Sequence, residues 1–219
     1  MGETGYFEKE YISSRHEYVE EVREIIEKGP PAPEQDWEVI WVLSGPEQKF
    51  DDPPREGKYN QTKHRFETAV NIAKEVTALR LQKMKEEVTL EDIAAHGPTL
   101  YFNGRDDQNQ AFRELIAGQG VEKEFQFPDA KVMVSSDLNI QSTSHQFELF
   151  PKDFVPEDAK LVVVTDLYHL PRTRRYFDKF PLVEKDKRVL YPALPASIPP
   201  RAALEEAKKI YPYIQQGFL

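Results

Sequence analysis

A continuous apolar run that turns abruptly polar, within residues 160–175, sets the strongest limit on how this chain can fold. Residues 161–164 read Leu-Val-Val-Val, which is apolar on both faces and rich in β-branched side chains, as in a parallel strand covered by helices on each side. Pro171 suits the first turn of a helix, where its missing N–H has no intrahelical partner to lose. His169 and Arg172 are therefore expected at a helix start that follows a buried strand, where backbone N–H groups favour an anion.

The same rhythm of strand, turn and helix repeats along the chain. Apolar runs predict strands at residues 38–44, 99–103, 131–135 and 161–165, with a further strand at 188–191. Helical spacing predicts helices at residues 6–28, 62–86, 89–95, 107–118 and 202–214, with a short helix through Phe147. Strands that alternate with helices predict an α/β fold, a Rossmann-like three-layer sandwich whose mostly parallel sheet has helices on both faces.

Length and composition limit the domain count and the partners. The 219 residues suit one domain at 37–195, preceded by a helix and Pro-rich linker at 1–36 and followed by a packing helix at 196–219. A net charge of −9 argues against nucleic acid and anionic membranes as partners, and no stretch approaches the roughly 18 apolar residues of a membrane span. The chain is expected to be soluble, with the cytoplasm favoured and the compartment otherwise open, because without cysteine there is no redox signal.

Ligands of an open parallel sheet bind outside the carboxyl ends of its strands. That rule selects the polar residues and glycines that follow each predicted strand: Ser44, Gly45, Asn103, Gly104, Asp137, Thr143, Thr165, Asp166, His169 and Arg172. The long polar segment 45–61 is expected to be mobile or to act as a lid. No Gly-x-Gly-x-x-Gly, P-loop, metal-ligand spacing or Gly-x-Ser-x-Gly occurs, so the motifs identify no cofactor, metal or serine nucleophile.

Several of these residues occur in an order that resembles the bacterial ElyC/SanA/YdcF-like domain family, a Rossmann-like domain of unknown function. The resemblance spans about residues 37–180 and rests on the Thr-x-x-x-His-x-x-Arg element Thr165, His169 and Arg172, on Arg65 with Ala69, on Asn103-Gly104 and on Asp137. Where the family has Asn-Thr-x-Glu-Asn, this chain has Ser-Thr-Ser-His-Gln at 142–146 and keeps only Thr143. The resemblance implies a small-molecule site for nucleotide-type or S-adenosylmethionine-like ligands. Because His145 stands where the family has a carboxylate, the resemblance does not define a reaction.

Each candidate residue has a functional and a structural interpretation. His169 is expected as a general acid or base, or else as a helix cap. Asp166 is expected to orient the His169 imidazole or to accept a hydrogen bond from a ligand hydroxyl, or else to cap the following turn. Arg172 and Arg65 are expected to clamp an anion, although Arg65 could instead form a surface pair with Glu67 or with an Asp of the loop at 45–61. Asp137 is expected to bind a ribose-like diol or help hold a cation, or else to shape its own turn.

Two classes of function follow from these interpretations. The first is an enzyme or a degenerate enzyme that binds a phosphorylated or nucleotide-like small molecule, with His169 and Arg172 facing one cavity together with Asn103, Gly104, Thr143 and Thr165. The second is a non-catalytic scaffold whose terminal helices bind a partner protein. The eroded element at 142–146 and the Pro-rich edges favour the second class.

Overall fold

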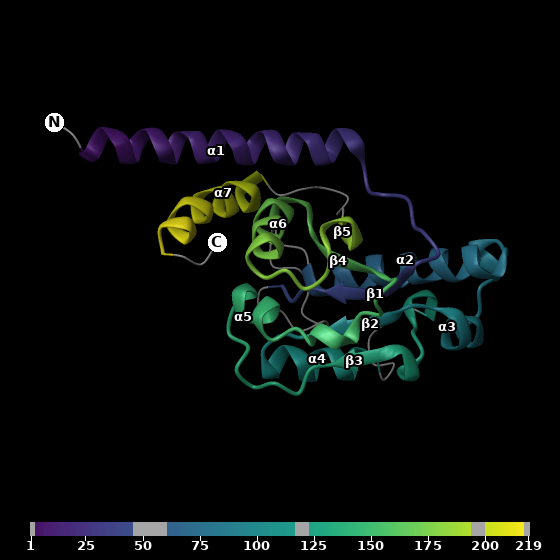
Figure 1. Ribbon diagram of the computed structural model, residues 1–219. Coiled ribbons are helices and arrows are strands. Elements are labelled where there is room, and N and C mark those ends of the chain that lie inside the picture. Colours follow the sequence, from purple (N-terminus) through teal and green to yellow (C-terminus); the bar gives the residue numbers. More distant parts are fainter. Residues whose placement is uncertain (1–2, 46–60, 117–122, 194–199, 217–219) are drawn as a thin grey trace.

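A single β-sheet lies at the centre of the fold, and all of its strands run parallel (Figure 1). The structure, a computed structural model, describes residues 3–45, 61–116, 123–193 and 200–216. Its sheet has the strand order β3-β2-β1-β4-β5. The strands are β1 (Trp37–Val42), β2 (Thr99–Phe102), β3 (Val132–Val134), β4 (Lys160–Asp166) and β5 (Arg188–Ala193). The predicted Rossmann-like α/β class is thereby confirmed, with all five expected strands in one sheet.

Seven α-helices and six short 3-10 helices occur among the described residues. The α-helices are α1 (Glu3–Lys28), α2 (Gln61–Leu81), α3 (Leu90–His96), α4 (Asp106–Ile116), α5 (Thr143–Glu148), α6 (Leu170–Lys179) and α7 (Pro200–Gln215). The 3-10 helices are η1 (Lys85–Glu87), η2 (Lys123–Phe125), η3 (Asp129–Lys131), η4 (Lys152–Phe154), η5 (Leu167–His169) and η6 (Lys185–Lys187).

Alternate residues of the strands supply two separate cores, one on each face of the sheet. From β1, Ile40 and Val42 pack with α2, α3 and α4, whereas Val39 and Trp41 pack with α5 and α6. The indole of Trp41 lies 4.7 Å from the ring of Phe147, measured between centroids, a geometry that contributes about 0.5–1.5 kcal/mol beyond the buried area. Both faces of β1 and β4 are therefore covered, as their continuous apolar sequences predict.

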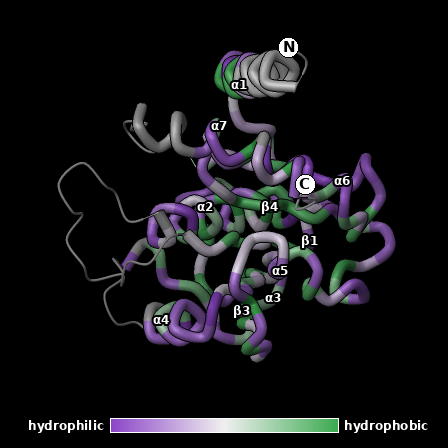
Figure 2. The backbone as a smooth tube through the Cα atoms, turned by 90° about the vertical axis from the view of Figure 1, so that its left-hand side faces the viewer, coloured by the Kyte–Doolittle hydropathy of each residue, from purple (hydrophilic) through white to green (hydrophobic). Residues whose placement is uncertain are grey.

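The two terminal helices lie together on one side of this sandwich (Figure 1). They meet over η5, where a small apolar cluster combines Tyr18 of α1, Tyr168 of η5, and Ala207 and Ile210 of α7. In Figure 2 the hydrophobic colour is concentrated along β1 and β4 inside the molecule, whereas α4 at its outside is mostly hydrophilic. The terminal helices thus cover the segment that follows β4, which is also the segment that carries the predicted site.

The helix boundaries follow local signals. Thr89 caps α3 through a capping box: its Oγ1 accepts from the N–H of Asp92 at 3.1 Å, and its own N–H donates to the Asp92 carboxylate at 3.0 Å. Helix α2 ends at Leu81, five residues earlier than expected, because Gln82 adopts φ 53° and the N–H of Lys83 bonds back to the carbonyl of Ala78. This is a Schellman ending with glutamine in the position that glycine usually takes.

None of the described helices combines the length and the apolar character needed to span a bilayer. Most of the loop predicted to be mobile, residues 46–60, lies outside the described residues.

Candidate functional site

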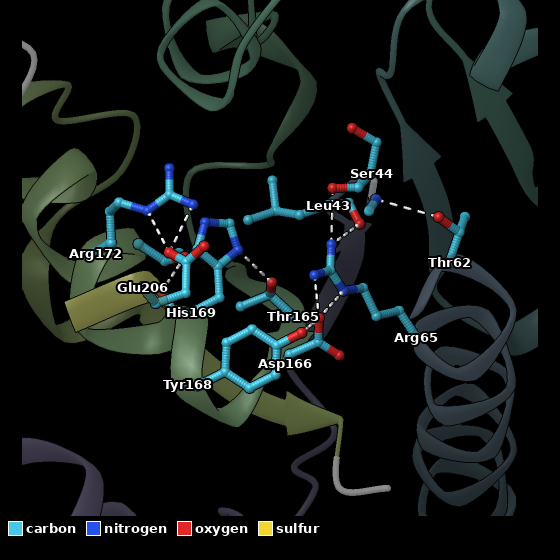
Figure 3. A network of polar contacts seen from close by, with 12 residues as sticks. Leu43, Ser44, Thr62, Arg65, Thr165, Asp166, Tyr168, His169, Arg172 and Glu206 are labelled. Carbon is cyan, nitrogen blue, oxygen red and sulfur yellow. Dashed lines mark hydrogen bonds and ion pairs between the residues drawn. The ribbon is translucent and has the colours of Figure 1, made fainter. Parts of the chain in front are cut away.

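The order of the strands reverses between β1 and β4, which is where α/β sheets of this kind bind ligands. Chain connections run from β1 to β2 and β3 on one side, then return to β4 on the other side of β1. The residues after β1 therefore face η5 and the start of α6, which follow β4. Figure 3 shows this corner, where Ser44, Arg65, Thr165, Asp166, His169 and Arg172 of the predicted set lie close together.

A buried ion pair between Arg65 and Asp166 lies at the centre of this corner (Figure 3). Arg65 donates from Nε to Oδ2 of Asp166 at 3.1 Å, and its Nη2 pairs with the same oxygen. Its Nη1 donates to the backbone carbonyls of Leu43 at 2.8 Å and Ser44 at 2.7 Å. One guanidinium thus ties α2, the end of β1 and the end of β4 together, and Arg65 is only 2% exposed. The alternative expectation of a surface pair for Arg65 is wrong.

Asp166 is fully buried and receives a third donor, the hydroxyl of Tyr168, at 3.2 Å from Oδ2. Asp166 stands at the N-cap position of η5, as its alternative interpretation expected, but its side chain makes no capping hydrogen bond there. The ring of His169 is instead oriented by Thr165, whose Oγ1 lies 2.9 Å from Nδ1. Asp166 therefore has a structural role that the sequence interpretation did not anticipate.

His169 is a buried imidazole with one nitrogen bonded and one not. It is 5% exposed, and its Nε2 has no hydrogen-bond partner among the described residues. Burial holds the pKa of His169 well below its ordinary value, and the positive charges of Arg172 and Arg65 lower this pKa further. The ring is consequently neutral at pH 7. In the tautomer whose Nδ1–H donates a hydrogen bond to Thr165 Oγ1, Nε2 carries a lone pair and can accept a proton.

Arg172 pairs with a carboxylate from the far end of the chain. Its Nε and Nη2 bond to Oε2 of Glu206 on α7 at 2.9 Å and 2.8 Å. The other oxygen of Glu206, Oε1, accepts from Nζ of Lys209 at 2.7 Å. The guanidinium also lies 5.5 Å from the centre of the Tyr213 ring, a cation–π distance. Helix α7 thus supplies both a counter-ion and an aromatic face to Arg172.

A pocket of about 300 Å³ opens beside Arg172. It is lined by Gln141, Ser142, Thr143, Ser144, Arg172, Tyr176 and Tyr213. Both α5 and α6 start at the carboxyl edge of the sheet, since each follows a strand, so the pocket lies at the predicted edge. Two predicted residues, Thr143 and Arg172, share this pocket, whereas His169, Asn103, Gly104 and Thr165 are not among the described residues that line it.

Asn103 belongs to a buried network of hydrogen bonds that connects the ends of β1 and β2 with α5. Its Oδ1 accepts from the indole N–H of Trp41 at 2.7 Å, and its Nδ2 donates to the carbonyl of Gln146 at 2.8 Å. The side chain of Gln146 returns a bond to the Asn103 carbonyl at 2.7 Å. These bonds attach α5 to the ends of β1 and β2, so Asn103 helps to hold the segment that lines the pocket in place.

The two glycines and Asp137 have structural explanations. A Cβ on Gly104 would lie 2.8 Å from Cβ of Gln108, so a close approach of α4 requires glycine there. Gly45 donates to Oγ1 of Thr62 at 3.1 Å and accepts from the side chain of Gln108 at 2.7 Å. Asp137 accepts from the N–H of Asn139 at 2.8 Å, which is the turn chemistry named as its alternative role.

Sequence reasoning missed the contributions of the terminal helices. Besides Glu206 and Tyr213, Tyr18 of α1 donates its hydroxyl to the backbone carbonyl of Tyr168 at 2.7 Å, and burial raises the pKa of Tyr18. Glu21 of α1 holds Arg175 of α6 with 2.6 Å between Oε1 and Nη2. No local motif marks these residues, because each partner lies more than 30 positions away.

The described residues contain no group of three or more His, Cys, Asp or Glu side chains that could hold a metal ion. Comparison with protein-family models, with curated proteins and with solved structures finds no match to this chain.

Proposed function

We propose that this protein binds a small anionic ligand, phosphorylated or nucleotide-like, in the pocket beside Arg172 at the carboxyl edge of the sheet. The observation that carries the proposal is the pocket itself, where an arginine, two tyrosine rings and a row of hydroxyl and amide side chains converge. Its volume of about 300 Å³ is at the lower end of the range for small-molecule sites, about 300–1,000 Å³. A phosphorylated sugar, or one part of a nucleotide, suits that size.

The lining supports recognition of a phosphate on a polar, ring-containing ligand. A guanidinium binds phosphate through parallel N–H donors, and Ser142, Thr143 and Ser144 provide hydroxyls that donate or accept. Tyr213 offers a ring against which a sugar or base can pack, whereas Tyr176, only 2% exposed and stacked on Phe147, forms a wall of the pocket. The resemblance to the ElyC/SanA/YdcF-like family, with its nucleotide-type or S-adenosylmethionine-like ligands, is part of this proposal.

Catalysis is the less supported half of the proposal. The favourable observation is the neutral imidazole of His169, whose buried Nε2 has no hydrogen-bond partner among the described residues and suits a proton acceptor. Asp166, the other residue expected to take part, already receives bonds from Arg65 and Tyr168. We therefore propose a binding protein first, with His169 as the group to test if turnover is found.

A second candidate function is a non-catalytic scaffold that binds a partner protein. The observation in its favour is that both arginines expected to clamp an anion are paired within the chain, Arg65 with Asp166 and Arg172 with Glu206. A scaffold needs those pairs for stability alone. A ligand-binding protein must also be able to open one of them.

A thermal-shift screen with nucleotides, sugar phosphates and S-adenosylmethionine separates the two functions. A ligand present at a hundredfold excess over its Kd stabilises the folded state by about 2.7 kcal/mol, which is a measurable shift in Tm. Replacing Arg172 by Met should abolish the shift for any phosphorylated ligand that the parent binds. Arg175→Met is the matched control, since Arg175 lies on the same helix but pairs with Glu21 and does not line the pocket. A silent screen, or equal shifts for Arg172→Met and the parent, favours the scaffold.

A further inference from the structure

We infer that Glu206 is an internal competitor for the ligand of this pocket, so that binding requires Arg172 to exchange the carboxylate of α7 for a phosphate dianion. This inference rests on the proposed function and adds the charge class of the ligand and the way in which the chain itself controls access. Its basis is the geometry of three side chains, Arg172, Glu206 and Lys209.

The carboxylate of Glu206 occupies one edge of the Arg172 guanidinium, formed by Nε and Nη2, through which an anion could be bound. Of the described residues that line the pocket, Arg172 carries the positive charge, and two of its nitrogens, Nε and Nη2, converge on one oxygen of Glu206. The side chains of the pair are only about a tenth exposed, at 10% for Arg172 and 9% for Glu206. At that burial the pair is screened little by salt, and an anion that binds the same edge of Arg172 must replace Glu206.

Lys209 provides a second cationic partner for Glu206, which an exchange at Arg172 requires. It lies one turn along α7 from Glu206, with Nζ 2.7 Å from Oε1, and its side chain is 44% exposed. Glu206 therefore keeps a cationic partner after Arg172 turns to a ligand, which avoids the large penalty of a buried unpaired carboxylate. The apolar contacts of Ala207 and Ile210 with Tyr18 and Tyr168 do not involve Arg172, so α7 can stay docked during the exchange.

The exchange selects for charge. A monocarboxylate ligand resembles Glu206 but has to displace a group held within the same chain, whose effective concentration is on the order of millimolar or higher. A phosphomonoester carries about −1.5 to −2 charges at pH 7 and three acceptor oxygens, so it binds the guanidinium more strongly than a carboxylate does. Glu206 thus makes the pocket accept phosphate dianions and reject monocarboxylates.

The test measures binding of inorganic phosphate and of acetate to the full chain by calorimetry at constant ionic strength. Glu206→Gln should bind phosphate at least about tenfold more tightly than the parent, the effect of freeing one charged hydrogen-bond pair, and should gain measurable acetate binding. Glu21→Gln is the matched control. It makes the same charge change in a terminal-helix carboxylate that pairs with an arginine of α6, but outside the pocket, and it should bind both anions as the parent does.

A second variant tests the exchange in the opposite direction. Lys209→Met removes the alternative partner of Glu206 at a half-exposed position, where the fold tolerates change, and should weaken phosphate binding by about three- to tenfold. This variant decides the matter alone if Glu206→Gln does not fold, as judged by circular dichroism.

The outcomes separate the two proposals. Unchanged or weaker phosphate binding in Glu206→Gln, with binding still lost in Arg172→Met, overturns the competitor role and leaves the proposed site intact. Parent-like binding in Lys209→Met counts equally against the exchange. Phosphate binding that survives in Arg172→Met overturns the proposed site itself, and the absence of phosphate binding in every variant overturns both.

Discussion

Removing Arg65 should destabilise the protein severely, because its guanidinium joins three segments at the centre of the carboxyl edge. The Arg65→Met change leaves the fully buried carboxylate of Asp166 with the Tyr168 hydroxyl in place of a cation, and it takes the Nη1 donor from the carbonyls of Leu43 and Ser44. Breaking one side of a buried pair typically costs about 3–5 kcal/mol. For a chain of this size that loss corresponds to roughly 6–20 °C in Tm, at about 2–4 °C for each kcal/mol.

Urea unfolding followed by circular dichroism measures this change in the free energy of unfolding, and a double-mutant cycle assigns it to the pair. Asp166→Leu alone should also lose about 3–5 kcal/mol, while Arg65→Met with Asp166→Leu should lose less than the sum of the two by at least about 2 kcal/mol. Glu24→Gln is the control, since Glu24 pairs with Lys28 where both side chains are more than half exposed, and it should change stability by less than about 0.5 kcal/mol. A loss below about 1 kcal/mol for Arg65→Met, or strict additivity in the cycle, would refute this account of the Arg65–Asp166 pair.

Two further predictions concern the groups around η5. The lowered pKa of His169 means that the unfolded chain binds a proton below pH 6.5 that the folded chain does not, so its contribution to stability is full above pH 6.5 and is lost as the pH falls. The difference in unfolding free energy between the parent and His169→Gln should therefore change by up to about 1.4 kcal/mol per pH unit below pH 6.5, and a difference independent of pH would contradict the buried neutral ring. Tyr18→Phe removes the hydroxyl that bonds to the Tyr168 carbonyl and should cost about 1 kcal/mol, with faster amide exchange in α1, whereas unchanged exchange would show that this bond does not hold the helix.

The sequence by itself determined the strands, most of the α-helices and the fold class, because the signals for them are local. The apolar run at 161–164 lies in β4, Pro171 lies in the first turn of α6 as expected, and the Thr89 capping box begins α3. Alternation of strands with helices was sufficient to predict a parallel sheet with two covered faces. The rule that ligands bind at the carboxyl ends of strands also predicted that the polar residues at the ends of β1 and β4 lie together. Most of them do lie at one corner, beside Arg65, which the family resemblance had selected.

Only the tertiary structure decided what those residues do. The partner of Arg65 lies 101 positions away and that of Arg172 lies 34 positions away, at segments that meet because β4 returns beside β1 and α7 packs over η5. A charged side chain interacts over a few ångströms, so its role depends on which segments become neighbours and how much water they exclude. The order of strands and the docking of terminal helices set those neighbours, and no residue pattern within the strands or helices themselves encodes them.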